Sequence, residues 1–107
     1  MTPPKVALRA SYHRRVITAI VLIRTARGKT QASAEALLEI DGVNEVYSVT
    51  GEYDLVAIVR LHQYEQMAEV VSQRMARVDG LERTETLMAF ECFSRHDLER
   101  MWTIGTE

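Results

Sequence analysis

One short polar stretch of the chain combines residue types that suit recognition of a small zwitterion. The stretch reads Thr50-Gly51-Glu52-Tyr53-Asp54 and separates two apolar segments. An amino acid needs a carboxylate for its ammonium group and N–H or O–H donors for its own carboxylate. Asp54 could supply the carboxylate, and backbone N–H groups near Gly51 could supply the donors. The hydroxyls of Thr84 and Thr86 could add to them, so these residues together form a candidate ligand-binding site.

Ordinary structural roles for the same residues stay open at this point. Gly51 and Asp54 also suit a plain hairpin turn, because glycine and aspartate both favour turn conformations. Thr84 and Thr86 are common strand residues. Tyr53 could line a cleft or pack on a neighbouring subunit. The pattern alone does not separate these roles from ligand binding.

Other kinds of chemistry have weaker support. The histidines, His13, His62 and His96, are scattered without paired-ligand spacing, so we expect no metal site. The chain has no glycine-rich phosphate loop, and we expect no cofactor. Cys92 is the single cysteine, which excludes an intrachain disulfide. It lies within the apolar strand expected at residues 82–94, and we predict a small buried side chain there.

Length and composition predict one small globular domain. The chain has 107 residues, of which 47% are hydrophobic and 26% charged. No apolar run approaches the roughly 18 residues that would cross a membrane. Residues 1–15 lack the apolar core of a secretory signal. We therefore expect a cytoplasmic protein that does not interact with membranes.

The charge of the chain is unevenly distributed. Four basic residues and no acidic ones occur in residues 1–15, although the net charge of the whole chain is -2. The remainder is acidic and would be repelled by phosphate backbones, so we expect it to bind nucleic acid poorly by itself. We interpret residues 1–15 as a flexible basic extension.

A repeated phrase predicts the order of the elements. Ile40-Asp41-Gly42-Val43 and Val78-Asp79-Gly80-Leu81 each join a helix-like segment to a strand-like one, with glycine able to adopt positive φ after a helix. Together with an apolar strand at residues 16–24, the phrase predicts β-α-β-β-α-β. The other expected strands are residues 43–50, 54–62 and 82–94. The expected helices start near residue 30, capped by Thr30 or Ser33, and span residues 63–78, with a short terminal helix at 97–102.

The strands are apolar on both faces, which has a consequence for assembly. A four-stranded antiparallel sheet with both helices on one face leaves its other face bare. Two such faces would bury each other at a spacing of about 10 Å. We therefore expect at least a homodimer that forms a dimeric α+β barrel by sheet-to-sheet packing.

Two runs of sequence resemble a known family. Residues 43–56 and 80–88 contain a Thr-Gly-x-x-Asp hairpin and a Gly-Leu-x-x-Thr-x-Thr strand start. They resemble the effector-binding domain of the Lrp/AsnC regulators, also called the RAM domain. The resemblance implies a ferredoxin-like α+β fold for residues 16–94, dimers that assemble into octamers or similar rings, and amino-acid effectors bound between dimers. Residues 95–107 would form a C-terminal tail.

The resemblance also bears on partners. A full-length regulator of this family would carry a helix-turn-helix domain before the effector domain, and residues 1–15 cannot form one. The chain is therefore similar to stand-alone members, so we expect no direct sequence-specific DNA binding. The resemblance also implies a full-length regulator as a possible partner.

The function expected from all of this is a non-catalytic effector sensor that modulates transcriptional regulation. The alternative is a small dimeric α+β barrel enzyme of the cofactor-free monooxygenase or isomerase type. Such an enzyme would need polar side chains between sheet and helices, whereas the strands here supply mainly aliphatic ones.

Overall fold

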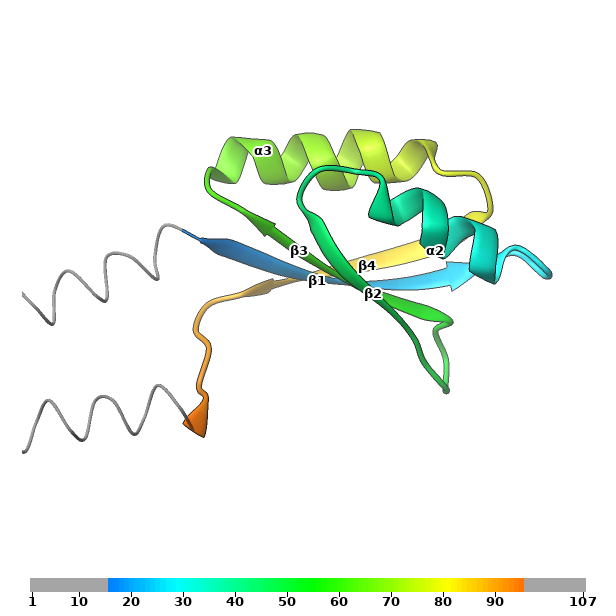
Figure 1. The fold of residues 1–107 in the computed structure, drawn as a ribbon, viewed down its shortest axis with the longest axis horizontal. Coiled ribbons are helices and arrows are strands. Elements are labelled where there is room, and N and C mark those ends of the chain that lie inside the picture. The colour runs from blue at the N-terminus through cyan, green and yellow to red at the C-terminus, as the bar shows by residue number, and fades with distance from the viewer. Residues whose placement is uncertain (1–15, 96–107) are drawn as a thin grey trace, which may run out of the picture.

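The computed structural model describes residues 16–95, and these form the predicted alternation of strands and helices. The elements in chain order are β1 (Ile17–Thr25), α2 (Thr30–Leu38), β2 (Val43–Ser48), β3 (Leu55–Leu61), α3 (Tyr64–Ala68) and β4 (Leu81–Ala89). A π-helical turn (Glu69–Arg74) and a 3-10 turn (Met75–Arg77) continue α3. Figure 1 shows both helical segments on the same side of the sheet.

The four strands form one antiparallel sheet in the order β2-β3-β1-β4. This topology is the ferredoxin-like α+β fold, so the predicted fold class is confirmed. β1 lies between two strands, and its helix-facing side chains are buried in the core. Leu22 pairs with Val56 on β3 and with Glu85 on β4.

The core lies between the sheet and the helices. Alternate residues of β1, namely Ala19, Val21 and Ile23, are fully buried. Leu55, Ala57 and Val59 of β3 lie beside them on the same side of the sheet. The helices contribute Leu37, Met67, Val70 and Met75. Burial of side chains of this size stabilises the fold by roughly 1.5–3 kcal/mol each, so this layer holds the helices on the sheet.

Both copies of the repeated Asp-Gly phrase form the turn between a helical segment and the following strand. Gly42 has φ 101 and Gly80 has φ 91, which is the left-handed region that glycine favours. At Gly80 a Cβ atom would lie only 2.7 Å from Ser33 Oγ, so the turn also needs glycine for close packing. The predicted duplication of the strand-helix-strand unit is confirmed.

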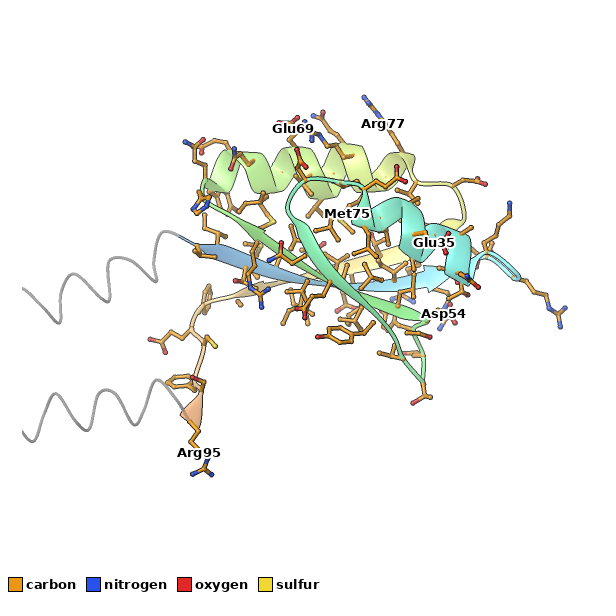
Figure 2. The ribbon with its side chains drawn as sticks, viewed as in Figure 1. Glu35, Asp54, Glu69, Met75, Arg77 and Arg95 are labelled. Carbon is orange, nitrogen blue, oxygen red and sulfur yellow. The ribbon has the colours of Figure 1, made fainter. Side chains whose placement is uncertain are left out.

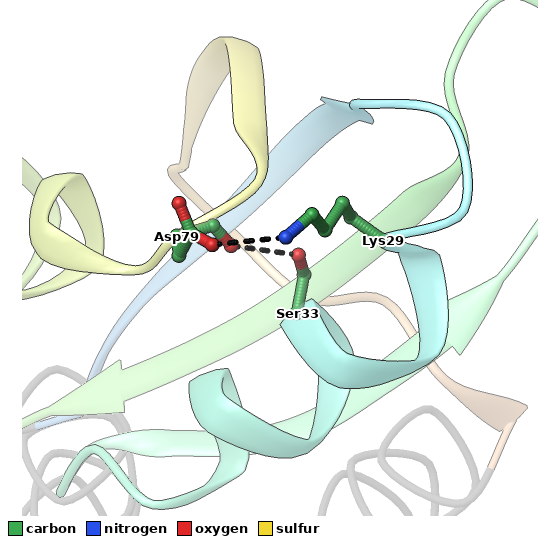
Figure 3. Close-up of polar contacts among 3 residues, drawn as sticks. All are labelled: Lys29, Ser33 and Asp79. Carbon is green, nitrogen blue, oxygen red and sulfur yellow. Dashed lines mark hydrogen bonds and ion pairs between the residues drawn. The ribbon is translucent and has the colours of Figure 1, made fainter.

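A side-chain contact between α2 and the turn before β4 adds to the pairing of β1 with β3 and β4 in joining the two units. The buried Ser33 hydroxyl donates a hydrogen bond of 2.9 Å to the backbone oxygen of Asp79. Lys29 Nζ lies 3.2 Å from the Asp79 carboxylate, in an ion pair on the surface (Figure 3). The predicted cap at Thr30 or Ser33 is wrong: Lys29 precedes the helix, and no side chain caps it. Both hydroxyls instead bond to groups outside the helix.

The last strand is shorter than predicted. It ends at Ala89, opposite Thr18, and not at residue 94. Its neighbour β1 begins at Ile17, so beyond Ala89 hardly any partner strand remains to continue the ladder. Cys92 is consequently exposed, and its predicted burial is wrong. The predicted terminal helix at 97–102 lies outside the described residues.

The side of the sheet away from the helices carries a second apolar surface. We call it the open face. Its centre consists of Ile20, Leu22, Val56 and Ile58, with Tyr47 and Leu87 at its two margins. The four central residues are half-buried in one chain, whereas Leu87 is 44% exposed. The prediction of two apolar faces is confirmed for β1 and β3, while on this side β4 also carries Arg83 and Glu85. Within residues 16–95 no helix is long and apolar enough to cross a membrane.

Candidate functional site

The hairpin of residues 50–54 lies at the end of the sheet where β1 ends and β4 begins. Figure 2 shows Asp54 at this end, beside the β2–β3 hairpin. Because β1 and β3 are antiparallel and Ile23 pairs with Leu55, Asp54 comes next to Thr25. The topology therefore brings the hairpin to the start of α2 and to the start of β4.

Asp54 is the best-anchored residue of the hairpin. Its Oδ2 atom accepts a hydrogen bond of 2.8 Å from the backbone N–H of Thr25 and one of 3.3 Å from the Thr25 hydroxyl. Its own backbone N–H donates to the oxygen of Ile23 over 2.8 Å. The carboxylate thus fixes the point at which β1 leaves the sheet. Among the described residues, nothing donates to Oδ1, which leaves one carboxylate oxygen for a ligand.

Thr25 is a neighbour of the candidate site that the sequence reasoning missed. Its hydroxyl also lies 2.7 Å from that of Thr30, the first residue of α2. The available signal was a threonine directly after the apolar strand predicted for residues 16–24; in the structure it is buried, and a buried hydroxyl needs a partner. The Asp54 side chain therefore anchors the end of β1 and not the turn of its own hairpin, and its remaining oxygen leaves the ligand role open.

Tyr53 and Glu52 link the hairpin to the neighbouring strands β4 and β1. The Tyr53 hydroxyl donates a hydrogen bond of 2.7 Å to Glu85 Oε1 on β4, and this bond raises the pKa of Tyr53 above its ordinary value. The Arg83 guanidinium lies 6.0 Å from the centroid of the Tyr53 ring. Arg24 donates through Nη2 and Nε to the backbone oxygen of Glu52, over 2.6 Å and 3.1 Å. No pattern in the sequence pointed to these arginines.

Gly51 leaves the tip of the hairpin open. Its φ is 109, and a Cβ atom placed there would meet nothing within 4 Å. Thr50 and Glu52 on either side are exposed. The backbone at this tip is therefore accessible to a ligand or to a second chain.

Thr84 and Thr86 do not join the hairpin residues in a single cavity. They pair with Ile23 and Val21, so they lie on the helix side of the sheet, whereas Glu85 lies on the open face. Both are exposed. Thr86 lines a shallow trough of about 250 Å³ beside α3, together with Tyr64, Met67, Ala68, Val71 and Ser72. Within one chain, the predicted site residues are thus divided between two sides of the sheet.

The interior of the described chain is a packed, mainly apolar layer. Its buried polar residues are Thr25 and Ser33, and each hydroxyl is hydrogen-bonded. Within residues 16–95 no three side chains of the metal-binding types converge. What the geometry provides is a set of polar groups at one end of a rigid sheet, which suits binding.

Comparison with known families decides the class of the protein. The family model described as the Lrp/AsnC ligand binding domain matches residues 18–98. The chain belongs to this family. The resemblance inferred from residues 43–56 and 80–88 is therefore confirmed. This Lrp/AsnC domain is a ligand-binding domain of a family of transcriptional regulators.

Individual relatives agree with this assignment. An uncharacterized HTH-type transcriptional regulator of Pyrococcus furiosus is 37% identical over 76 residues, which are 68% of this chain and 51% of the relative. The chain thus accounts for about half of that regulator's length. The crystal structure of TTHA0845 from Thermus thermophilus is 53% identical, with a TM-score of 0.69, and the match covers 74% of this chain and 99% of that one.

A third relative was solved with a ligand. It is the feast or famine regulatory protein Rv3291c from M. tuberculosis, in complex with L-methionine. It is 25% identical to this chain with a TM-score of 0.61, and the match covers 79% of this chain and 57% of the regulator.

Proposed function

We propose that this Lrp/AsnC domain senses an amino acid or a closely related small metabolite at the hairpin of residues 50–54. The observation that carries the proposal is the Asp54 carboxylate, held by Thr25 through one oxygen while the other oxygen stays available. That oxygen suits an ammonium group, and the accessible backbone at Gly51 suits a carboxylate. The similar M. tuberculosis regulator, solved with L-methionine, supports an amino acid as the ligand class.

The proposed site requires more than one copy of the chain. Thr84 and Thr86 lie on the helix side of β4, away from Tyr53 and Glu85. A ligand that uses both groups of donors would have to lie where the hairpin of one copy meets β4 of another. Ligand binding and assembly would then be coupled, because the ligand contacts two copies at once.

The open face is the surface through which we propose the first step of assembly, a homodimer. Its central residues, Ile20, Leu22, Val56 and Ile58, are apolar, and its margins carry charged groups such as the Glu45–Arg60 pair at 3.6 Å. An apolar centre with a polar rim is the usual anatomy of a protein interface. Dimers would then associate into an octamer or a similar ring, in which the sensing sites form between dimers.

The proposed role in regulation is non-catalytic. Thr25 and Ser33, the buried polar residues of the described chain, serve structural hydrogen bonds, and the layer between sheet and helices is otherwise apolar. The relatives are transcriptional regulators. We propose that the domain modulates such a regulator by contact, with a full-length Lrp/AsnC protein as the partner and without binding DNA itself.

The proposal can be tested by thermal unfolding of the full chain with each of the twenty protein amino acids. A true ligand should raise the midpoint progressively as its concentration exceeds the dissociation constant. The variant D54N keeps an oxygen that can accept from Thr25 but loses the negative charge, so we expect it to fold and to lose the response. D41N is the matched control, because Asp41 lies in the turn before β2, at the other end of the sheet.

Two outcomes would count against the site. If no amino acid moves the unfolding midpoint of the wild type at millimolar concentration, the ligand class is wrong. If an amino acid stabilises the wild type and D54N equally, the ligand is real but binds elsewhere.

A further inference from the structure

Residues 90–95 leave the sheet with two aromatic side chains in water. Phe90 is 97% exposed and Phe93 is 78% exposed, and they are the two phenylalanines of the chain. Two phenyl rings present on the order of 300 Å² of apolar surface. Exposed apolar surface on that scale commonly marks an interaction site. The two rings of this segment therefore suit a contact with another molecule.

The direction of the segment points to where that contact lies. Figure 1 shows residues 90–95 running from the end of β4 to the side of the sheet opposite α2 and α3. Figure 2 shows Arg95, at the end of the segment, far from both helices. The open face is on this same side. A second copy seated on the open face would therefore lie beside the segment.

The length of the segment is sufficient to reach that copy. Six extended residues span up to about 20 Å, whereas two packed sheets are about 10 Å apart. Within the described residues, β1 pairs with β4 no further than Thr18 and Ala89, so the segment is not part of the ladder. The segment can thus cross the gap between two packed sheets without breaking any hydrogen bond between β1 and β4.

We propose that residues 90–95, called the arm from here on, clasp a second copy of this chain and bury Phe90 and Phe93 on that copy. The inference rests on the dimer of the proposed function and adds a second contact to it. In a two-fold dimer each subunit gives one arm and receives one, so the contact occurs twice. It would raise the buried area toward the roughly 800 Å² per partner that stable complexes need.

Cys92 provides a direct probe of the arm. It lies between the two phenylalanines, it is exposed in a single chain, and no other cysteine competes for a thiol reagent. We expect a maleimide to label Cys92 at least tenfold more slowly in the wild-type dimer than in L87D, a variant designed to disrupt the open face. L38D should label as slowly as the wild type, because Leu38 is similarly exposed but lies on α2.

Equal labelling rates in a dimeric wild type and a monomeric L87D would overturn the proposal and leave the dimer intact. Slow labelling in both would overturn it too, because the arm would then fold onto its own subunit. A monomeric wild type would remove the dimer on which the arm depends. The ligand response of the Asp54 experiment is a separate readout, so failure of the arm and failure of sensing can be told apart.

A double variant tests the rings themselves. F90S/F93S should weaken dimerisation at least tenfold in sedimentation or light-scattering titrations. Its circular dichroism should not change, because both rings have little contact with their own subunit. Y64S is the control, since Tyr64 is an aromatic residue that is 66% exposed on α3, on the helix side of the sheet. An unchanged dimer affinity in F90S/F93S would contradict the proposal.

Discussion

Two tyrosines donate hydrogen bonds to carboxylates, and their titration reports those contacts. The pKa of Tyr53 is raised above 10.0 mainly by its bond to Glu85, and that of Tyr47 mainly by its bond to Glu45. We expect E85Q to lower the pKa of Tyr53 and leave Tyr47 unchanged, and E45Q to do the reverse. NMR of ring-labelled tyrosine between about pH 8 and 12 would measure both. A Tyr53 pKa unaffected by E85Q would show that the hairpin does not reach β4.

The sign of the stability effect follows from the same shift. A raised pKa means that the folded chain holds the phenolic proton more tightly than the unfolded chain does. The stabilisation is therefore fully present below the ordinary tyrosine pKa and is lost as pH rises through the folded value. At neutral pH the Tyr53–Glu85 contact should be intact.

Asp54 marks the limit of residue-level prediction. Residue type suggested that its side chain could serve its own hairpin turn, because aspartate commonly bonds to nearby backbone N–H groups. Its actual partner, Thr25, is far away in sequence and comes close only through the pairing of β1 with β3. The split of Thr84 and Glu85 between two faces follows from strand alternation, but their relation to the hairpin needed the strand order.

At the scale of elements, the contact between α2 and the turn before β4 contains one buried hydrogen bond and one exposed ion pair. Ser33 is 1% exposed and bonds to the Asp79 oxygen, whereas the Lys29–Asp79 pair is open to solvent. We expect S33A to destabilise the fold by about 1–2 kcal/mol, because it removes a buried hydrogen bond. K29A should cost about 0.5 kcal/mol or less, as surface ion pairs do.

Urea unfolding would measure both variants. Equal effects of S33A and K29A would contradict the distinction between the buried hydrogen bond and the exposed ion pair in the contact of Figure 3. The variant D79A is unsuitable for this purpose, because Ser33 bonds to the backbone oxygen of Asp79 and would keep its acceptor.

Element types were more predictable than element ends. Apolar alternation and the Asp-Gly phrase predicted four strands and two helices in the right order, because both signals are local. The start of α2 was predicted correctly near residue 30, but the end of β4 depends on where β1 stops offering partners, and the hydroxyl contact of Thr30 depends on the distant Thr25. Such non-local contacts cannot be read from a short window of sequence.

At the scale of the whole molecule, the open face determines whether the chain functions alone. Half-buried Leu22 and Val56 have no covering layer within the described chain, and both helices lie on the other side. A monomer would leave this surface in water, so its burial against a second copy is the main source of free energy for the proposed assembly.

A matched pair of leucine substitutions tests this assembly. Leu87 pairs with Ile20 at the margin of the open face and is 44% exposed, whereas Leu38 lies on α2 and is 50% exposed. L87D places a charge in the proposed interface, and we expect it to weaken dimerisation at least about 30-fold, as removal of an interface hot spot does. L38D introduces the same charge at similar exposure and should leave the dimer intact, because α2 covers the opposite side of the sheet. Light scattering coupled to size-exclusion chromatography over a dilution series would give both dissociation constants. Dissociation by L38D but not by L87D would place the interface on the helical layer and would remove the open face from the proposed assembly.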